Sequence, residues 1–214
     1  IIAGSSYSDS LVWFKSLRSD SIDATIRLIS NSTDLRNLIA DDIDGNGWAD
    51  ILFSSSQDSS IKYIPNLGSE TFGSQQTIAN GLFGIGDLLF CDINNDGLKD
   101  ILVASSYNIL WFQNLGSGNF GSSQVISNVG AHVIHAADLT NNGYLDIISG
   151  SANDLAWHEN LIGSFGPKQV INLVQSPSSI CTDDINHDGN VDIISYYDDT
   201  YLEWYENFGG GVFT

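Results

Sequence analysis

Four segments of the chain place oxygen-bearing side chains at the same short spacing. They are DIDGNGWAD at 42–50, DINNDGLKD at 92–100, DLTNNGYLD at 138–146 and DINHDGNVD at 184–192. Each begins with Asp, carries an oxygen-bearing side chain at its third and fifth positions, and has Gly at the sixth and Asp at the ninth. Hard oxygen ligands around a sharp glycine turn are what a calcium ion needs. We therefore expect up to four structural calcium sites, in segments called loops one to four.

The expected ligands are the side chains at positions one, three, five and nine and the backbone carbonyl at position seven. Loop three has two carboxylates where the others have three, so we expect it to bind calcium most weakly. In chain order, the ligands are Asp42, Asp44, Asn46, Trp48 and Asp50; Asp92, Asn94, Asp96, Leu98 and Asp100; Asp138, Thr140, Asn142, Tyr144 and Asp146; and Asp184, Asn186, Asp188, Asn190 and Asp192.

An alternative is that these residues simply form solvated hairpin turns, which Asp, Asn and Gly favour. Four copies in register favour metal binding over this alternative. The loops resemble the first nine positions of an EF-hand, but none has the bidentate Glu at position twelve. We therefore expect an affinity typical of extracellular modules, about 10⁻⁴–10⁻³ M.

The loops recur every 46 to 50 residues, a period typical of solenoids and propellers. A β-branched run such as ILVASS follows each loop, and an aromatic run such as ILWFQN comes next. A glycine-rich turn, often with Phe-Gly, leads to a third short run, and a fourth enters the next loop. These short β-branched and aromatic segments predict four antiparallel strands per repeat and no helix. Stacking such sheets around an axis covers both faces of each, which predicts an all-β fold, a β-propeller of four-stranded blades.

The repeat also predicts the domain organisation. We expect a single propeller region over 1–214, with a partial blade at 1–31, blades at about 32–80, 81–128 and 129–174, and an incomplete blade at 175–214. The opening IIAGSS matches the run that follows a loop, and the closing GGGVFT also stands in mid-pattern. About four and a half blades are fewer than such propellers usually have. We therefore expect the chain to be part of a longer polypeptide.

Composition excludes some partners. The net charge is −19 and Lys plus Arg total only 7, so a basic face for nucleic acid is not expected. Eleven of the 26 acidic residues occupy ligand positions (three in loops one, two and four, and two in loop three), so much of the charge is explained by the loops. No apolar stretch is long enough to span a membrane. The two cysteines, Cys91 and Cys181, are expected to be free and buried.

Other residues have both a structural and a functional interpretation. The aromatic residues at the third position of the aromatic runs are expected to pack between blades, although they could stack on sugars. Trp48 is expected to pack on a neighbouring blade or to be an exposed contact. The pairs Asp41-Asp42 and Asp183-Asp184 are weak candidates for a glycosidase dyad. An irregular cluster around Tyr197 is either a binding loop or an ordinary hairpin. The aromatic set is Trp13, Tyr63, Trp111, Trp157 and Trp204.

The loop motif, the strand after it and the downstream N-x-G-x-x-F-G resemble FG-GAP/VCBS repeats over essentially the whole chain. Such repeats form the propellers of integrin α chains, of certain fungal lectins and of many secreted proteins. The resemblance implies that each loop joins the innermost strand of a blade to the second strand, on one rim of the propeller. The chain departs from the family pattern at Thr140, which replaces Asp or Asn, and at Tyr63, which replaces Trp.

The resemblance also implies a function. The family is mostly non-catalytic and works through protein or glycan recognition. We therefore expect a non-enzymatic, lectin-like or cell-adhesion module of a secreted or cell-surface protein, with a glycan or a protein as its ligand. The alternative is the propeller part of a secreted carbohydrate-active enzyme, because some members are attached to such enzymes. A structural spacer without a ligand is the third possibility.

Overall fold

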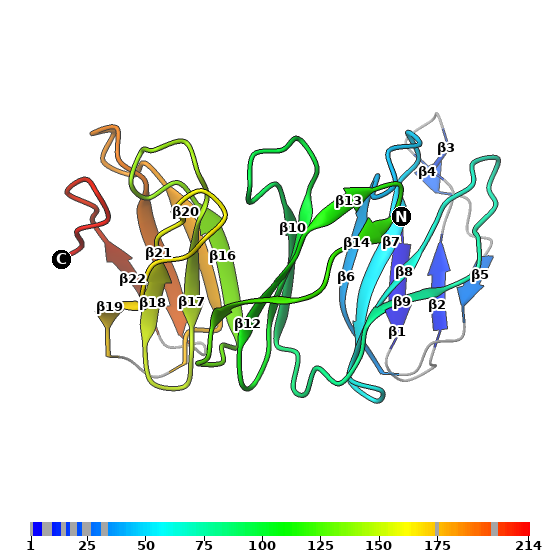
Figure 1. Cartoon of the computed structure of the whole chain (residues 1–214), viewed down its shortest axis with the longest axis horizontal. Coiled ribbons are helices and arrows are strands. Elements are labelled where there is room, and N and C mark those ends of the chain that lie inside the picture. The colour runs from blue at the N-terminus through cyan, green and yellow to red at the C-terminus, as the bar shows by residue number, and fades with distance from the viewer. Residues whose placement is uncertain are drawn as a thin grey trace. The chain divides into compact units, whose positions relative to one another are not determined.

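The computed structural model describes residues 2–5, 10–13, 16–17, 21–22, 27–30, 34–173, 176–197 and 201–214. All regular secondary structure in this part of the chain consists of β-strands (Figure 1), as the short β-branched and aromatic runs predict. No helix that could cross a membrane is found among these residues. The chain divides into two compact units, Ile1–Gly84 with Leu115–Phe120, and Ile85–Asn114 with Gly121–Thr214.

The first unit contains a three-stranded and a four-stranded antiparallel sheet. The three-stranded sheet has the order β1-β2-β5, the four-stranded sheet has the order β6-β7-β8-β9, and a short pair is formed by β3 and β4. The two larger sheets pack on one another through Leu11, Leu35, Ile51, Phe53 and Ile64. The strands are β1 (Ile2–Ser5), β2 (Ser10–Trp13), β3 (Ser16–Leu17), β4 (Ser21–Ile22), β5 (Arg27–Ser30), β6 (Leu35–Asp41), β7 (Asp50–Ser55), β8 (Ser60–Ile64) and β9 (Gln76–Ala79).

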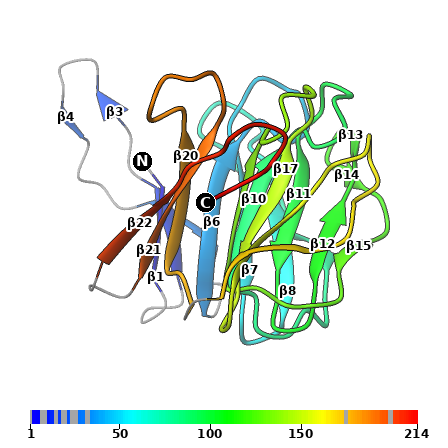
Figure 2. The same cartoon turned by 90° about the vertical axis from the view of Figure 1, so that its left-hand side faces the viewer.

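The second unit contains three successive antiparallel sheets, with the orders β10-β11-β12-β15, β16-β17-β18-β19 and β20-β21-β22. Figure 2 shows the three strands of the last sheet side by side. The segment that leaves and rejoins this unit forms a further short pair, β13 with β14, of which residues 115–120 belong to the first unit. The strands are β10 (Asp87–Cys91), β11 (Asp100–Ala104), β12 (Ile109–Phe112), β13 (Asn114–Gly116), β14 (Asn119–Phe120), β15 (Gln124–Ser127), β16 (Val133–Ala137), β17 (Asp146–Gly150), β18 (Leu155–His158), β19 (Gln169–Asn172), β20 (Ser179–Asp183), β21 (Asp192–Tyr197) and β22 (Tyr201–Tyr205).

The sheets of the second unit pack face to face. Side chains of a strand alternate between its two faces, and β17 therefore contributes to two cores. Ile147 packs in the cluster with Leu102 and Trp111, whereas Ile148 packs in the cluster with Trp157 and Ile193. The first strands of the three sheets are also neighbours, because β10 contacts β16 and β16 contacts β20. Within this unit, successive blades thus meet along their first strands.

Burial follows the position of a strand in its sheet. The second and third strands of the four-stranded sheets are buried along their whole length, whereas the first two residues of each fourth strand are exposed. Strands covered on both faces are expected to read as continuous apolar runs without alternation. This explains why the runs that follow the loops, such as ILVASS, do not alternate between apolar and polar residues.

A β-bulge recurs where the third strand of a sheet meets the fourth. Leu110 pairs with Val125 and Ile109 pairs with Ser127, so that Ile126 is left without a partner in the ladder. The bulge turns this isoleucine into the core, where it is only 9% exposed. The same register shift occurs in three other sheets, and the residues that correspond to Ile126 are Ile29, Ile78 and Ile171.

The predicted packing of the periodic aromatic residues holds for most copies and is wrong for one. Trp111 meets Phe165, and Trp157 meets Phe213, with ring centroids 6.4 and 6.5 Å apart and edge-on geometry. In the first unit, Trp13 meets Phe72 in the same way. Tyr63 is 2% exposed. Trp204 is 49% exposed, because no later Phe-Gly segment lies against it within the described residues.

Two smaller expectations can also be compared with the structure. Both cysteines are free, but Cys181 is exposed, so the expectation of a buried thiol is wrong for that residue. Of the irregular cluster, residues 198–200 lie outside the described part of the chain. Its flanking residues Tyr197 and Tyr201 stack with their ring centroids 4.9 Å apart. This cross-strand stack fits an ordinary hairpin.

Candidate metal centres

Each loop connects the first strand of a four-stranded or three-stranded sheet to the second. Loop one lies between β6 and β7, loop two between β10 and β11, loop three between β16 and β17, and loop four between β20 and β21. The sixth position has φ between 87° and 92° in all four loops, which only glycine adopts without strain. The fourth position is also left-handed, and its occupants in chain order are Gly45, Asn95, Asn141 and His187.

The aspartate at position one holds the turn together. In loop one, Asp42 Oδ1 accepts the backbone N–H groups of Gly45 and Asn46 at 2.9 and 3.0 Å, and Oδ2 accepts that of Gly47 at 2.8 Å. Asp92, Asp138 and Asp184 accept the N–H groups of positions five and six in the same way. A carboxylate oxygen can accept more than one interaction, so these oxygens can still face a cation.

The side chains at positions three and five form a ladder of short turns. Asp44 Oδ1 accepts the N–H of Asn46 at 3.0 Å, and Asn46 Oδ1 accepts that of Trp48 at 2.8 Å. In loops two and four, Asn94 and Asn186 occupy position three and make the equivalent bond to Asp96 and Asp188. At position five, Asp96, Asn142 and Asp188 each accept the N–H of the position-seven residue, namely Leu98, Tyr144 and Asn190.

The aspartate at position nine is the first residue of the second strand and is fully buried in every loop. Asp50 Oδ1 accepts the N–H of Asn66 at 2.6 Å, and Oδ2 accepts those of Ile43 at 2.9 Å and Asp44 at 3.2 Å. Burial raises the pKa of Asp50, and these backbone hydrogen bonds oppose the rise. Burial likewise raises the pKa of Asp100 and of Asp146 to about 6. Desolvated carboxylates of this kind gain from a bound cation.

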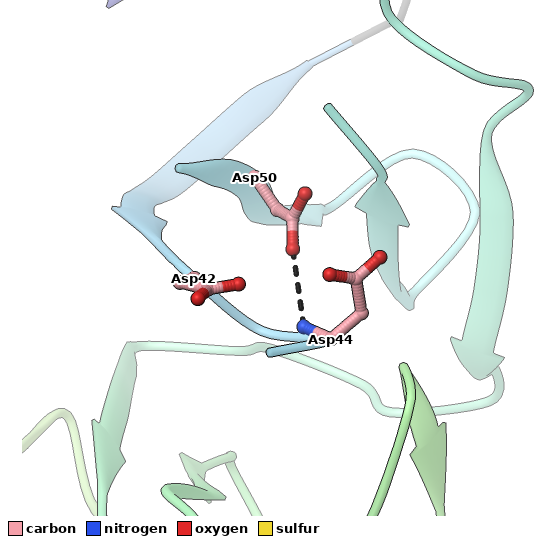
Figure 3. Close-up of side chains that lie close together, drawn as sticks. All are labelled: Asp42, Asp44 and Asp50. Atoms are coloured by element: carbon pink, nitrogen blue, oxygen red, sulfur yellow. Dashed lines mark hydrogen bonds between the residues drawn. The ribbon is translucent and has the colours of Figure 1, made fainter. Parts of the chain in front are cut away.

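Loop one brings its three carboxylates together. One oxygen from each of Asp42, Asp44 and Asp50 lies within 4.8 Å of the others, and Figure 3 shows the three side chains converging on one space. In the part of the chain that the structure describes, no other loop forms such a group of three acids. Loops two and four carry Asn at position three, and their third acid is at position five. Loop three has only Asp138 and Asp146.

Two buried oxygens at predicted ligand positions accept or donate no hydrogen bond. They are Asp100 Oδ2 in loop two and Thr140 Oγ1 in loop three. In loops one, three and four, the equivalent of Asp100 Oδ2 accepts the N–H of position two. Buried polar atoms without partners are rare in native proteins and often mark an ion or a water. The residues of the loops therefore fit a calcium ion, and their role as its ligands stays a prediction.

An asparagine just after the third strand of each of the four sheets with a loop has a role that the loop motif alone does not predict. Asn160 is fully buried, donates its N–H to Asp146 Oδ1 at 2.7 Å, and donates its side-chain amide to the carbonyl of Leu145 at 3.0 Å. The asparagine thus fixes both the last ligand of the loop and the residue before it. The signal was present in the sequence, because an asparagine closes four of the five aromatic runs. The equivalent residues are Asn66, Asn114 and Asn207.

Trp48 is about half exposed, in line with the second of its two expected placements, an exposed contact. Its side chain is 53% exposed, and its indole covers Gly68 of its own repeat, where an added Cβ would lie 2.8 Å from the indole Nε1. Glycine at position 68, with φ 76°, leaves the room that the indole ring occupies.

The model of the FG-GAP-like repeat family matches the chain three times, at residues 42–103, 92–149 and 138–195. No curated protein is significantly similar to the chain in sequence. A solved lectin from Agrocybe aegerita, described as specifically recognising non-reducing terminal N-acetylglucosamine, is 19% identical with a TM-score of 0.67. The alignment covers 96% of this chain and 59% of the lectin chain.

A second solved structure, the Tc holotoxin pore of Photorhabdus luminescens, is 17% identical with a TM-score of 0.46, over 96% of this chain and 10% of its own. The family match, the antiparallel four-stranded sheets and the likeness to the lectin together confirm the predicted fold class, an all-β propeller built of four-stranded blades. The chain spans 59% of the length of the lectin it resembles.

Proposed function

The chain belongs to the FG-GAP-like repeat family, and from this premise we propose that it is a calcium-stabilised propeller module that recognises a glycan or a protein outside the cell. The observation that carries the metal part is the convergence of Asp42, Asp44 and Asp50 within 4.8 Å. Three carboxylates at this distance repel one another, and a divalent cation among them removes the repulsion. When bound, calcium supplies positive charge and fixed coordination that hold the loop in one conformation.

The recognition part of the proposal is supported by side chains next to the loops. In the second unit, Tyr144, Leu161 and Ile162 line an open hollow together with Asn142 and Asn160. Leu161 is 51% exposed and Ile162 71% exposed. Apolar side chains beside a few polar groups are typical of sites that bind small organic ligands, including the apolar faces of sugars. The lectin from Agrocybe aegerita recognises a terminal sugar, and we propose a glycan as the first ligand class to test.

We propose that the module is not itself an enzyme. The carboxylate of Asp41 accepts the N–H of Asp42 at 2.9 Å, and that of Asp183 accepts the N–H of Asp184 at 2.9 Å. Asp42 and Asp184 are in turn engaged by their own loops. Two carboxylates that bind the backbone in this way do not face one another across a substrate, as a glycosidase dyad does. Attachment to a carbohydrate-active enzyme is the alternative that a reducing-sugar assay of the full-length protein tests.

We propose an extracellular location for the module because of the calcium affinity that is expected of its loops. Loops with three or fewer carboxylates and no bidentate Glu are expected to bind calcium at about 10⁻⁴–10⁻³ M, so they fill where calcium is millimolar. This is the concentration range of extracellular modules.

A glycan array on the calcium-loaded chain tests the recognition part. We expect binding to a restricted set of glycans, loss of that binding in Tyr144→Ala, and retention in Tyr107→Ala. Tyr107 is a matched control because it is 65% exposed and lies between β11 and β12, outside the hollow. Binding to no glycan would remove the glycan from the proposal and leave a protein ligand. Equal loss in both variants would show that the hollow is not the contact.

A further inference from the structure

Consecutive loops of the second unit are joined by side-chain amides on the surface. Asn95 of loop two donates from Nδ2 to the carbonyl of Gly143 in loop three at 2.7 Å. Asn141 of loop three donates from Nδ2 to the carbonyl of Gly189 in loop four at 3.3 Å and contacts Asn190 Oδ1 at 3.2 Å. Both donors hold position four of their loop, and both acceptor glycines hold position six of the next. The same link is therefore made twice in series.

A second set of links is buried beneath the first. The side-chain amide of Asn160 donates to the carbonyl of Ile93 in loop two at 2.7 Å and to that of Leu145 in loop three at 3.0 Å. Asn207 donates in the same manner to Leu139 in loop three at 2.8 Å and to Val191 in loop four at 3.0 Å. Each amide has two N–H groups, so both are used, one for each loop.

The carbonyl groups that accept these hydrogen bonds belong to the predicted calcium-binding loops. Gly143 donates its N–H to Asp138 and accepts from Asn95 through its carbonyl, and it stands between the predicted ligands Asn142 and Tyr144. Loop two adds a second observation, because the carboxylate of Asp100 is fully buried and therefore gains from a cation beside it. A loop that is held in its metal-bound conformation therefore fixes the peptide group at position six of the next loop, between two of its predicted ligands.

We propose that loops two, three and four bind calcium cooperatively, with Asn95 and Asn141 as positioning residues that transmit the ordering of one loop to the next. The proposal rests on the calcium binding proposed above. A first ion orders its own loop and, through these amides, part of the neighbouring loop, so that the second ion has less conformational entropy to remove. By linkage, each of two coupled loops raises the affinity of the other by the same factor.

The chain itself supplies the substitution that tests this. Position four of loop one is Gly45, with φ 80°, whereas Asn95 and Asn141 have φ 58° and 57°. Glycine therefore fits this backbone position, and Asn95→Gly with Asn141→Gly removes the amides without straining the turn. Asn128→Gly is the matched control, because Asn128 is exposed and lies between β15 and β16, outside the loops.

Calorimetric titration of the metal-free chain with calcium gives the stoichiometry, the midpoint and the Hill coefficient. For the wild type and for Asn128→Gly we expect a Hill coefficient above 1. For the double glycine variant we expect the same number of ions, a raised midpoint and a Hill coefficient below that of the wild type, because only the buried links through Asn160 and Asn207 remain. Melting curves of the metal-free variants check that each chain is folded.

A second titration isolates one link. Asp188→Ala removes a ligand from loop four, and in the wild-type background it should also weaken the remaining sites. In the Asn141→Gly background this additional weakening should be smaller, because only the buried link through Asn207 still joins loops three and four. Independent binding in the wild type, or a double glycine variant that titrates like the wild type, would overturn the cooperative link while leaving calcium binding intact. Absence of calcium binding in the folded wild type would instead overturn the proposed function and the link together.

Discussion

The side-chain amide of Asn160 donates a hydrogen bond at 2.7 Å to the carbonyl of Ile93, which lies 67 residues earlier in the chain. Both groups are buried, and the bond joins the end of the third strand in one blade to the metal loop of the blade before it. The bond thus connects the packing of blades in the second unit to the conformation of a candidate metal centre.

Replacement of this asparagine should destabilise the second unit. Asn160→Ala leaves the buried carbonyl of Ile93 and the partly buried carbonyl of Leu145 without their donor, which we expect to lower the free energy of unfolding by about 2–4 kcal/mol. Urea unfolding of the calcium-free chain measures this. Asn153→Ala is the control, because Asn153 is exposed and donates only through its backbone, and its effect should be within about 0.5 kcal/mol. Equal effects would contradict the role given to Asn160.

Two tryptophans at the same repeat position should differ strongly in their contribution. Trp111 is 4% exposed and packs against Phe165, so Trp111→Ala opens a cavity and should lower the free energy of unfolding by about 3–5 kcal/mol. Trp204 is 49% exposed, and Trp204→Ala should cost about 1 kcal/mol or less. Chemical unfolding of both variants provides the measurement. A similar loss for the two would show that Trp204 is covered in solution.

These examples show what the sequence can and cannot predict. The strands and the loops could be predicted, because β-branched runs and the spacing of Asp, Asn and Gly depend on local geometry. The recurrence of Asn160 and its equivalents is visible in the sequence, but the hydrogen bond to Ile93 could not be predicted, since this partner is distant in sequence. The exposure of Trp204 was missed for a related reason, because burial of an aromatic residue depends on a side chain from another repeat. The buried bulge at Ile126 breaks the strand period and has no local signal.

The ion pair of Asp58 with Lys62 should make stability depend on pH in the acid range. Burial raises the pKa of Asp58, but hydrogen bonds from Lys62 and Ser60 outweigh it and lower the pKa to about 2. The folded pKa is below the value of about 3.9 for an unfolded chain, so the stabilisation is present above about pH 4 and is lost as the pH falls towards 2.

The measurement is the difference in melting temperature between the wild type and Asp58→Asn from pH 5 to pH 2, without calcium. We expect a constant difference above about pH 4 that shrinks as the pH falls towards 2, where the carboxyl group is protonated in the unfolded chain and about half protonated in the folded one. A difference that stays the same over the whole range would contradict the ion pair.

The backbone conformation of Ile162 should make this residue destabilising to the fold. Its φ of 62° is left-handed, which is unfavourable for a β-branched residue, and 71% of the residue is exposed. Ile162→Gly should therefore raise the free energy of unfolding by about 1 kcal/mol. The neighbouring Leu161, which does not have a positive φ, is the control, and Leu161→Gly should be destabilising by about 0.5–1 kcal/mol. Destabilisation by both changes would show that the backbone at Ile162 is not strained.

The most direct test of calcium binding combines elemental analysis of the purified chain with melting curves in 10 mM calcium and in EDTA. For a dissociation constant of about 1 mM, each filled loop adds about 1.4 kcal/mol, which corresponds to roughly 3 °C in a chain of this size. We predict bound calcium and a melting temperature several degrees lower in EDTA. A chain without calcium that melts at the same temperature in both solutions would contradict the account.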